Sequence, residues 1–142
     1  MVWKSAGTAA YAGAALCASV AGAQAPERAG AQRDWSVFAI GSGADRVCYV
    51  VSAPTEWRAR RGGARVEVNR GDIFLMVSDR PADGVDDEVS FVAGYPFREG
   101  STVNVDIGGT DFTLYTDREN AWPENPAADA RLVEAMRRGL NG

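Results

Sequence analysis

The sequence contains no histidine, and this absence removes several common kinds of catalytic and metal site. Without imidazole the chain has no Ser-His-Asp or Cys-His catalytic group, and it lacks the commonest zinc and haem ligand sets. Phosphate-binding loops and dinucleotide-binding fingerprints are also missing, because Gly41-Ser42-Gly43 lacks the following helix that such motifs need. We therefore predict no enzyme activity, no cofactor, and no catalytic, cofactor-binding or metal-ligating residue.

Lysine occurs only once, at Lys4, so almost all of the positive charge comes from arginine. The chain carries 15 basic and 19 acidic residues, a formal net charge of −4. This modest acidity disfavours nonspecific binding to nucleic acid as the main role. The 142 residues are enough for a single domain with a real core.

The first 25 residues have the layout of an export signal. Lys4 and the amino terminus form a positive region, residues 6–20 are apolar and rich in alanine, and small residues at 21–25 offer a cleavage site. The apolar stretch is too short and too rich in alanine for a transmembrane helix, which needs about 20 strongly apolar residues. We expect residues 1–25 to be a signal peptide and the mature chain to have no transmembrane segment. An ordinary N-terminal helix is one alternative, and lipidation at Cys17 is another, although Leu16 stands where a small residue is expected.

The rest of the chain reads mainly as short strands. Residues 26–33 are polar and rich in alanine and glycine, and we expect a disordered leader there. From residue 34 to residue 142 we expect one β domain. Short apolar segments separated by turn residues predict an antiparallel β-sandwich or a barrel-like fold. The segments are 35–40, 46–52, 72–78 and 88–93.

The strongest local pattern is a hairpin around Gly108-Gly109. Two glycines between alternating segments are a hairpin signal, because glycine accepts the positive φ of the primed turns. With these glycines as the loop, Val105 faces Phe112 and Val103 faces Leu114 on one apolar face. The turn and the alternation therefore predict the same register.

One helix is expected near the C-terminus. Asn125 suits the N-cap and Pro126 the first helical position, where its missing N–H is not needed. Apolar residues recur along the segment at helical spacing, and Gly139 is able to end the helix. The apolar stripe consists of Ala128, Leu132, Val133 and Met136.

Residues 56–71 are rich in arginine and glycine and predict a long exposed hairpin loop. Guanidinium groups there suit bidentate binding of phosphate or carboxylate on a partner, and an exposed tryptophan suits a contact anchor. A solvated loop whose arginines pair with local acids is the alternative interpretation. The candidate partner-binding residues are Trp57, Arg58, Arg60, Arg61 and Arg65.

Three groups of acidic residues are further candidates, one for calcium binding and two for glycosidase chemistry. The group at 83–88 is acidic enough for calcium but lacks the alternating ligand spacing of an EF-hand loop, which favours a solvated turn. Glu119 with Glu124, or Asp106 with Asp111, would be a glycosidase pair only if a cleft held them at the required separation.

Four stretches carry a resemblance to a known family. They are RVCYVVSAP at 46–54, GDIFLMVSDRP at 71–81, residues 89–108 around the Gly-Tyr-Pro-Phe sequence of 94–97, and LVEAM at 132–136. In this order and spacing they resemble the invasion-associated locus B family of exported proteins from Gram-negative, mainly alphaproteobacterial, bacteria. The resemblance spans residues 34–139.

The resemblance implies a small all-β protein of the periplasm or the outer surface that takes part in envelope or host-cell interaction and virulence. It also implies a further strand pair, a short helix and a terminal cysteine after the LVEAM helix, the last bonded to the counterpart of Cys48. On this resemblance the β domain of residues 34–142 is expected to be incomplete at its C-terminus. No catalytic residue is carried over. We expect a non-enzymatic exported protein that binds a protein or an envelope or host-surface component. A periplasmic scaffold or chaperone-like strand-pairing module is the alternative.

Overall fold

The computed structural model describes residues 24–139. The expected signal peptide and Cys17 therefore lie almost entirely outside the described residues. Within them, ten strands and one α-helix follow one another, with two short 3-10 turns. The strands are β1 (Glu27–Gln32), β2 (Trp35–Ile40), β3 (Val47–Ser52), β4 (Ala59–Arg61), β5 (Ala64–Val66), β6 (Phe74–Arg80), β7 (Val85–Val92), β8 (Thr102–Ile107), β9 (Thr110–Asp117) and β10 (Asn120–Trp122), and the helix is α1 (Pro126–Gly139). Among the described residues, no helix is long and apolar enough to cross a membrane.

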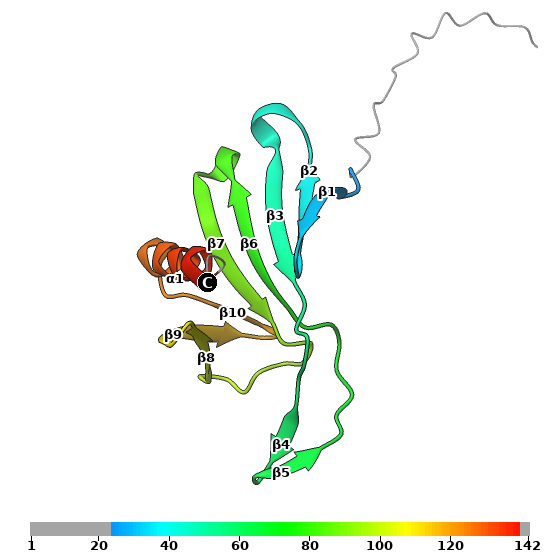
Figure 1. Cartoon of the computed structure of the whole chain (residues 1–142), viewed down its shortest axis with the longest axis vertical. Coiled ribbons are helices and arrows are strands. Elements are labelled where there is room, and N and C mark those ends of the chain that lie inside the picture. Colours follow the sequence, from blue (N-terminus) through cyan, green and yellow to red (C-terminus); the bar gives the residue numbers. More distant parts are fainter. Residues whose placement is uncertain (1–23, 140–142) are drawn as a thin grey trace, which may run out of the picture.

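Eight of the strands form one antiparallel sheet in the order β1-β2-β3-β6-β7-β10-β9-β8, and β4 and β5 form a separate two-stranded sheet. This confirms a mainly β fold with a single C-terminal helix. The large sheet changes direction after β7, so that β8, β9 and β10 run across the upright strands (Figure 1). The sheet therefore curves around a core in the manner of an open barrel.

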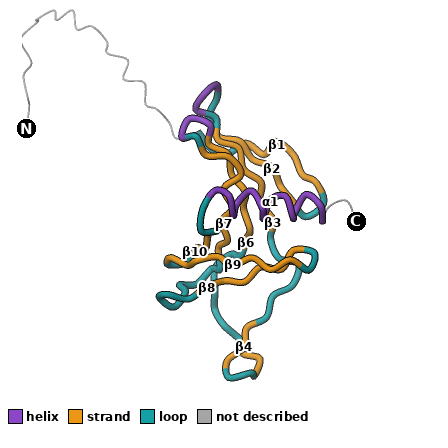
Figure 2. The backbone as a smooth tube through the Cα atoms, turned by 90° about the vertical axis from the view of Figure 1, so that its left-hand side faces the viewer, coloured by secondary structure: helices purple, strands orange, loops and turns teal. Residues whose placement is uncertain are grey.

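Helix α1 lies on the inner side of this curved sheet, against β7 and near β8 (Figure 2). Leu132 and Val133 of the helix pack with Val89, Leu114 and Ala121 of the sheet to form the buried core. The expected N-cap is confirmed, because Asn125 Oδ1 accepts a hydrogen bond of 3.0 Å from the Ala128 N–H. The helix thus joins the two parts of the sheet through one apolar stripe.

The predicted β8–β9 hairpin is confirmed residue by residue. Val103 pairs with Leu114 and Val105 with Phe112, and Ile107 pairs with Thr110 beside the turn. Both turn glycines have positive φ, 58° at Gly108 and 84° at Gly109, as a primed turn requires.

The leader expected at residues 26–33 is ordered, which corrects that prediction. Residues 27–32 form β1, which pairs antiparallel with β2. A turn at Arg33, whose φ is 52°, brings the chain back beside β2, and the two strands are joined by backbone pairing and by a hydrogen bond from Arg28 to Ser36 Oγ. Every residue of β1 is exposed, so hydrophobic patterning gives no sign of this strand.

The segment around Gly94 connects the sheet to the loop that carries β4 and β5. Gly71 donates its N–H to the Gly94 carbonyl oxygen at 2.7 Å, and Gly94 has a φ of 71°. A Cβ at position 94 would lie 2.4 Å from the Gly71 oxygen. The two backbones therefore meet where only glycine fits, and this contact fixes the base of the β4–β5 loop.

Candidate functional site

The basic segment is a small hairpin that projects from the body of the protein. Strands β4 and β5 extend away from the large sheet at the lower end of the molecule (Figure 1). The sequence predicts this stretch as an exposed hairpin loop, and the structure adds a paired register, Ala59 with Val66 and Arg61 with Ala64, around a Gly62-Gly63 turn. The hairpin presents its arginines away from the core.

The predicted arginines differ in their surroundings. Arg58 forms an ion pair with Glu56, as the solvated-loop interpretation expects. Arg60 donates a hydrogen bond of 3.3 Å to the Gly63 carbonyl. Neither Arg60 nor Arg61 nor Arg65 forms an ion pair with a carboxylate among residues 24–139.

Like charges lie directly opposite each other in this hairpin. Arg60 pairs with Arg65 across the two strands, an arrangement that destabilises a hairpin relative to neutral or opposite charges. No acidic residue occurs between Trp57 and Val66 to offset it. An anion bound between the two side chains would relieve this repulsion, so the hairpin is electrostatically suited to an anionic partner.

Trp57, the predicted contact anchor, stands at the base of the hairpin and is 46% exposed. The guanidinium carbon of Arg70 lies 5.0 Å from the Trp57 ring centre and 4.9 Å from that of Tyr95. Arg70 Nε also donates to the Ala93 carbonyl at 3.0 Å. Arg70 is thus held between two aromatic rings, and its cation–π contacts orient the Trp57 and Tyr95 side chains.

Sequence reasoning missed Arg70 and Tyr95 as members of this surface. They are far apart in the chain and meet through the Gly71–Gly94 contact, which no local pattern reveals. Tyr95, 44% exposed, contacts Phe97 with ring centres 5.5 Å apart, and Phe97 contacts Phe91 at 6.5 Å. We call Trp57, Arg70 and Tyr95 the aromatic cluster. Through Phe97 and Phe91 this exposed cluster is continuous with the core.

The acidic segment at 83–88 is engaged by arginines. Arg80 forms a bidentate pair with Glu88, at 3.0 and 3.1 Å, and approaches Asp83 at 3.5 Å. The hydrogen bond to Glu88 is the main reason that the pKa of Arg80 lies above its ordinary value. Asp87 accepts two contacts of 3.3 Å from Arg137. In residues 24–139 no group of three or more acidic or cysteine side chains is arranged to hold a metal ion.

The two acid pairs considered for glycosidase chemistry lie at the surface. Asp106 and Asp111 are opposite each other in the β8–β9 register, and both are exposed. Glu119 lies in the turn before β10, and Glu124 precedes the helix; both side chains are exposed as well. Neither pair therefore supplies a buried carboxyl group of the kind that glycosidases use as a general acid.

Comparison with protein families, with curated proteins and with solved structures finds no match to this chain.

Proposed function

We propose that the chain is a non-enzymatic exported binding protein that uses the β4–β5 hairpin to hold an anionic component of the bacterial envelope or of a host-cell surface. The observation that carries this proposal is a set of arginines on a projecting hairpin that form no ion pair within the described part of the chain, namely Arg60, Arg61 and Arg65. The export signal and the resemblance to the invasion-associated locus B family support a periplasmic or outer-surface location.

The chemistry of the hairpin agrees with an anionic partner. Guanidinium groups bind phosphate and carboxylate in a bidentate way and remain charged at every relevant pH. Because the whole chain is acidic, its positive charge at the hairpin also orients the molecule, with the hairpin toward an anionic surface. The aromatic cluster beside the arginines adds exposed rings for contact, as binding anchors commonly do.

Replacing Arg60, Arg61 and Arg65 together with serine is expected to weaken binding to vesicles that contain an anionic phospholipid by about tenfold or more. The reason is the loss of three positive charges that form no ion pair with a carboxylate among residues 24–139 and are therefore available to a partner. Binding is measured by vesicle co-sedimentation at low and at physiological ionic strength. The wild-type chain should bind the anionic vesicles less at higher salt and should not co-sediment with zwitterionic vesicles.

A matched control removes the same charge elsewhere. Arg98, Arg131 and Arg138 are also exposed, and serine at these three positions lowers the net charge equally. If binding depends on the position of the arginines in the hairpin, the control triple variant should bind with an affinity within about twofold of the wild type, since charges far from the contact are largely screened. Equal losses in the two triple variants would show a nonspecific charge effect and would remove the hairpin from the proposal.

A second candidate function, a periplasmic scaffold that pairs with strands of a client, rests on a different observation. The outer strands β1 and β8 each have one neighbour in the sheet, β2 and β9 respectively. All six residues of β1 are exposed. Such edges present unpaired backbone groups to which an extended peptide is able to add.

This second candidate predicts a separate response. In β1, Ala29 lies in the bulge between Arg28 and Gly30 and has no partner residue in β2. Ala29→Pro should therefore disturb the outer edge more than the β1–β2 pairing, and should reduce capture of an extended, strand-forming peptide severalfold. If capture is unchanged by Ala29→Pro but lost in the arginine triple variant, the strand-pairing function is wrong.

A further inference from the structure

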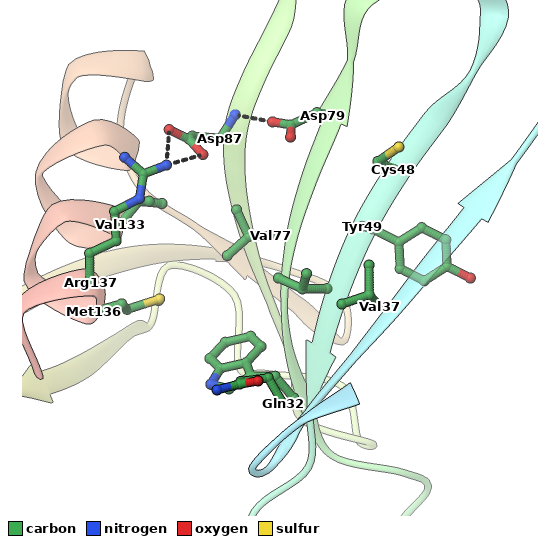
Figure 3. Close-up of a pocket in the computed structure, with 12 residues that line it drawn as sticks. Gln32, Val37, Cys48, Tyr49, Val77, Asp79, Asp87, Val133, Met136 and Arg137 are labelled. Atoms are coloured by element: carbon green, nitrogen blue, oxygen red, sulfur yellow. Dashed lines mark hydrogen bonds and ion pairs between the residues drawn. The ribbon is translucent and has the colours of Figure 1, made fainter. Parts of the chain in front are cut away.

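An open cavity of about 350 Å³ lies on the inner face of the curved sheet, beside α1 and away from the β4–β5 hairpin. Figure 3 shows side chains from β2, β3 and β6 on one side and from the helix on the other. Most of its surface is apolar. The apolar lining includes Trp35, Val37, Val50, Val77, Val133 and Met136.

The cavity exists because α1 covers only part of the inner face. The helix packs against β7 and β8, whereas it does not cover the same face of β2 and β3. Val37 and Val50 are paired in register there and remain half-buried. A contiguous apolar hollow of this kind is typical of a ligand site, and its volume lies at the lower end of the ~300–1,000 Å³ of small-molecule pockets.

One end of the cavity is polar and acidic (Figure 3). An irregularity in the β6–β7 pairing places Asp87 with a φ of 55°, and its N–H donates to Asp79 Oδ1 at 2.7 Å. The Asp87 carboxylate faces the Arg137 guanidinium at 3.3 Å. A backbone irregularity that redirects a side chain in this way is common beside binding sites.

The charges at this end do not cancel. Asp79 and Asp87 contribute two carboxylates, and Arg137 contributes one guanidinium that is already engaged by Asp87. An anionic head group would therefore meet an excess of negative charge, while a neutral or cationic one would not. Gln32 lines the opposite end and adds an uncharged amide.

We propose that this cavity binds one small amphiphile, with its apolar tail along the valines and its neutral or cationic head group beside Asp79 and Asp87. The volume limits the tail to a single chain or a small ring system. The proposal concerns a different surface from the hairpin and does not depend on the function proposed above.

The test compares decylammonium with decanoate, both below the concentrations at which they form micelles, by isothermal titration calorimetry on the full chain. We expect one decylammonium bound per chain and at least about tenfold weaker binding of decanoate. Asp79→Asn keeps an oxygen that accepts the Asp87 N–H and removes one negative charge. It should shrink the preference for decylammonium severalfold.

Filling the cavity gives the second arm. Val50→Phe should reduce decylammonium binding about tenfold or more, because the larger ring occupies the hollow. Val51→Phe is the matched control, since Val51 is the next residue of β3 and points to the other face of the sheet. Val37→Met repeats the filling from β2 if Val50→Phe does not fold, and circular dichroism reports folding for all three.

Three results would overturn the proposal. Equal binding by the Val50 and Val51 variants would place the amphiphile elsewhere, and equal affinity for decanoate would remove the role of the acidic end. A dimer in light scattering that Val50→Phe dissociates and decylammonium does not would assign the cavity to a second copy of this chain instead.

Discussion

Replacing Gly94 with alanine is expected to destabilise the folded chain by about 3 kcal/mol or more. The new Cβ would lie 2.4 Å from the Gly71 carbonyl oxygen and 2.9 Å from the Asp72 carbonyl oxygen. Both are backbone atoms, so neither is able to move away as a flexible side chain would. The φ of 71° at Gly94 adds the strain of a left-handed conformation. The free energy of unfolding is measured by urea titration with tryptophan fluorescence.

Two control variants separate crowding from backbone strain. Gly108 has a similar φ of 58° but open space around a new Cβ, so Gly108→Ala should cost only about 1–2 kcal/mol. Gly71 is the other partner of the close contact, yet its own Cβ would lie at an ordinary 3.6 Å from Gly94, so Gly71→Ala should cost less than Gly94→Ala. A Gly94→Ala variant no less stable than Gly108→Ala would contradict the close approach.

Removing the Asp129 carboxylate is expected to cost about 2 kcal/mol, the second largest effect. Asp129 is a buried residue of α1, and its Oδ1 accepts a 2.8 Å hydrogen bond from the N–H of Val89, which is fully buried in β7. Strand β10 reaches only Phe91 and Val92 of β7, so the Val89 N–H has no strand partner on that side. Asp129→Ala leaves this donor without an acceptor.

Asp129→Asn keeps an acceptor oxygen and removes the charge, so it isolates the electrostatic part. Burial is the main reason that the pKa of Asp129 lies above its ordinary value of 3.8; the Val89 hydrogen bond lowers it, and the neighbouring Glu88 and Asp87 raise it further. The neutral form is therefore the one that folding favours. We expect Asp129→Asn to be at least as stable as the wild type at pH 7 and Asp129→Ala to be clearly less stable.

The same shift has a pH signature with a defined sign. Between pH 3.8 and the raised value, the folded chain binds more protons at Asp129 than the unfolded chain does. The contribution of Asp129 to the free energy of unfolding is therefore fully present below pH 3.8 and falls as the pH rises through the folded pKa. In urea titrations across this range, the free energy of unfolding of the wild type minus that of Asp129→Asn should fall as the pH rises. A rise of this quantity with pH would contradict the burial of this carboxyl.

The parts of the fold that follow from the sequence are those in which two local constraints coincide. At Gly108-Gly109 the turn chemistry and the alternation of apolar residues demand the same register, and the structure has that register. Asn125, Pro126 and the apolar stripe likewise agree on one helix. In each of these elements the turn or capping residues and the apolar pattern lie within one short segment, so both are visible in the sequence.

The parts that the sequence does not predict either lack an apolar pattern or depend on long-range contacts. Strand β1 belongs to the first kind, because all its residues are exposed and it pairs with β2 through backbone groups and an Arg28–Ser36 hydrogen bond. Arg70 joins the candidate binding surface because Gly71 and Gly94 meet, which brings Tyr95 as well as Trp57 against its guanidinium. The cavity depends on how far α1 covers the inner face of the sheet. None of these features has a local signal in the chain.

The hairpin follows from the sequence, whereas its role in partner binding stays a prediction. The structure places the four arginines on or beside one projecting element, with Trp57 at its base. It also separates Arg58, which pairs with Glu56, from Arg60, Arg61 and Arg65, which have no acidic partner among residues 24–139. In the Gly-Tyr-Pro-Phe segment, Tyr95 contacts Arg70 at the base of the hairpin and packs against Phe97.

Hydrogen–deuterium exchange of the chain with and without envelope membranes tests the proposed binding surface most directly. We predict slower exchange at residues 57–66 on binding, with β1 and β8 unchanged, and loss of that protection in the Arg60, Arg61 and Arg65 serine variant. Protection confined to β1 or β8, with residues 57–66 exchanging as they do in the free protein, would contradict the hairpin proposal and favour strand pairing.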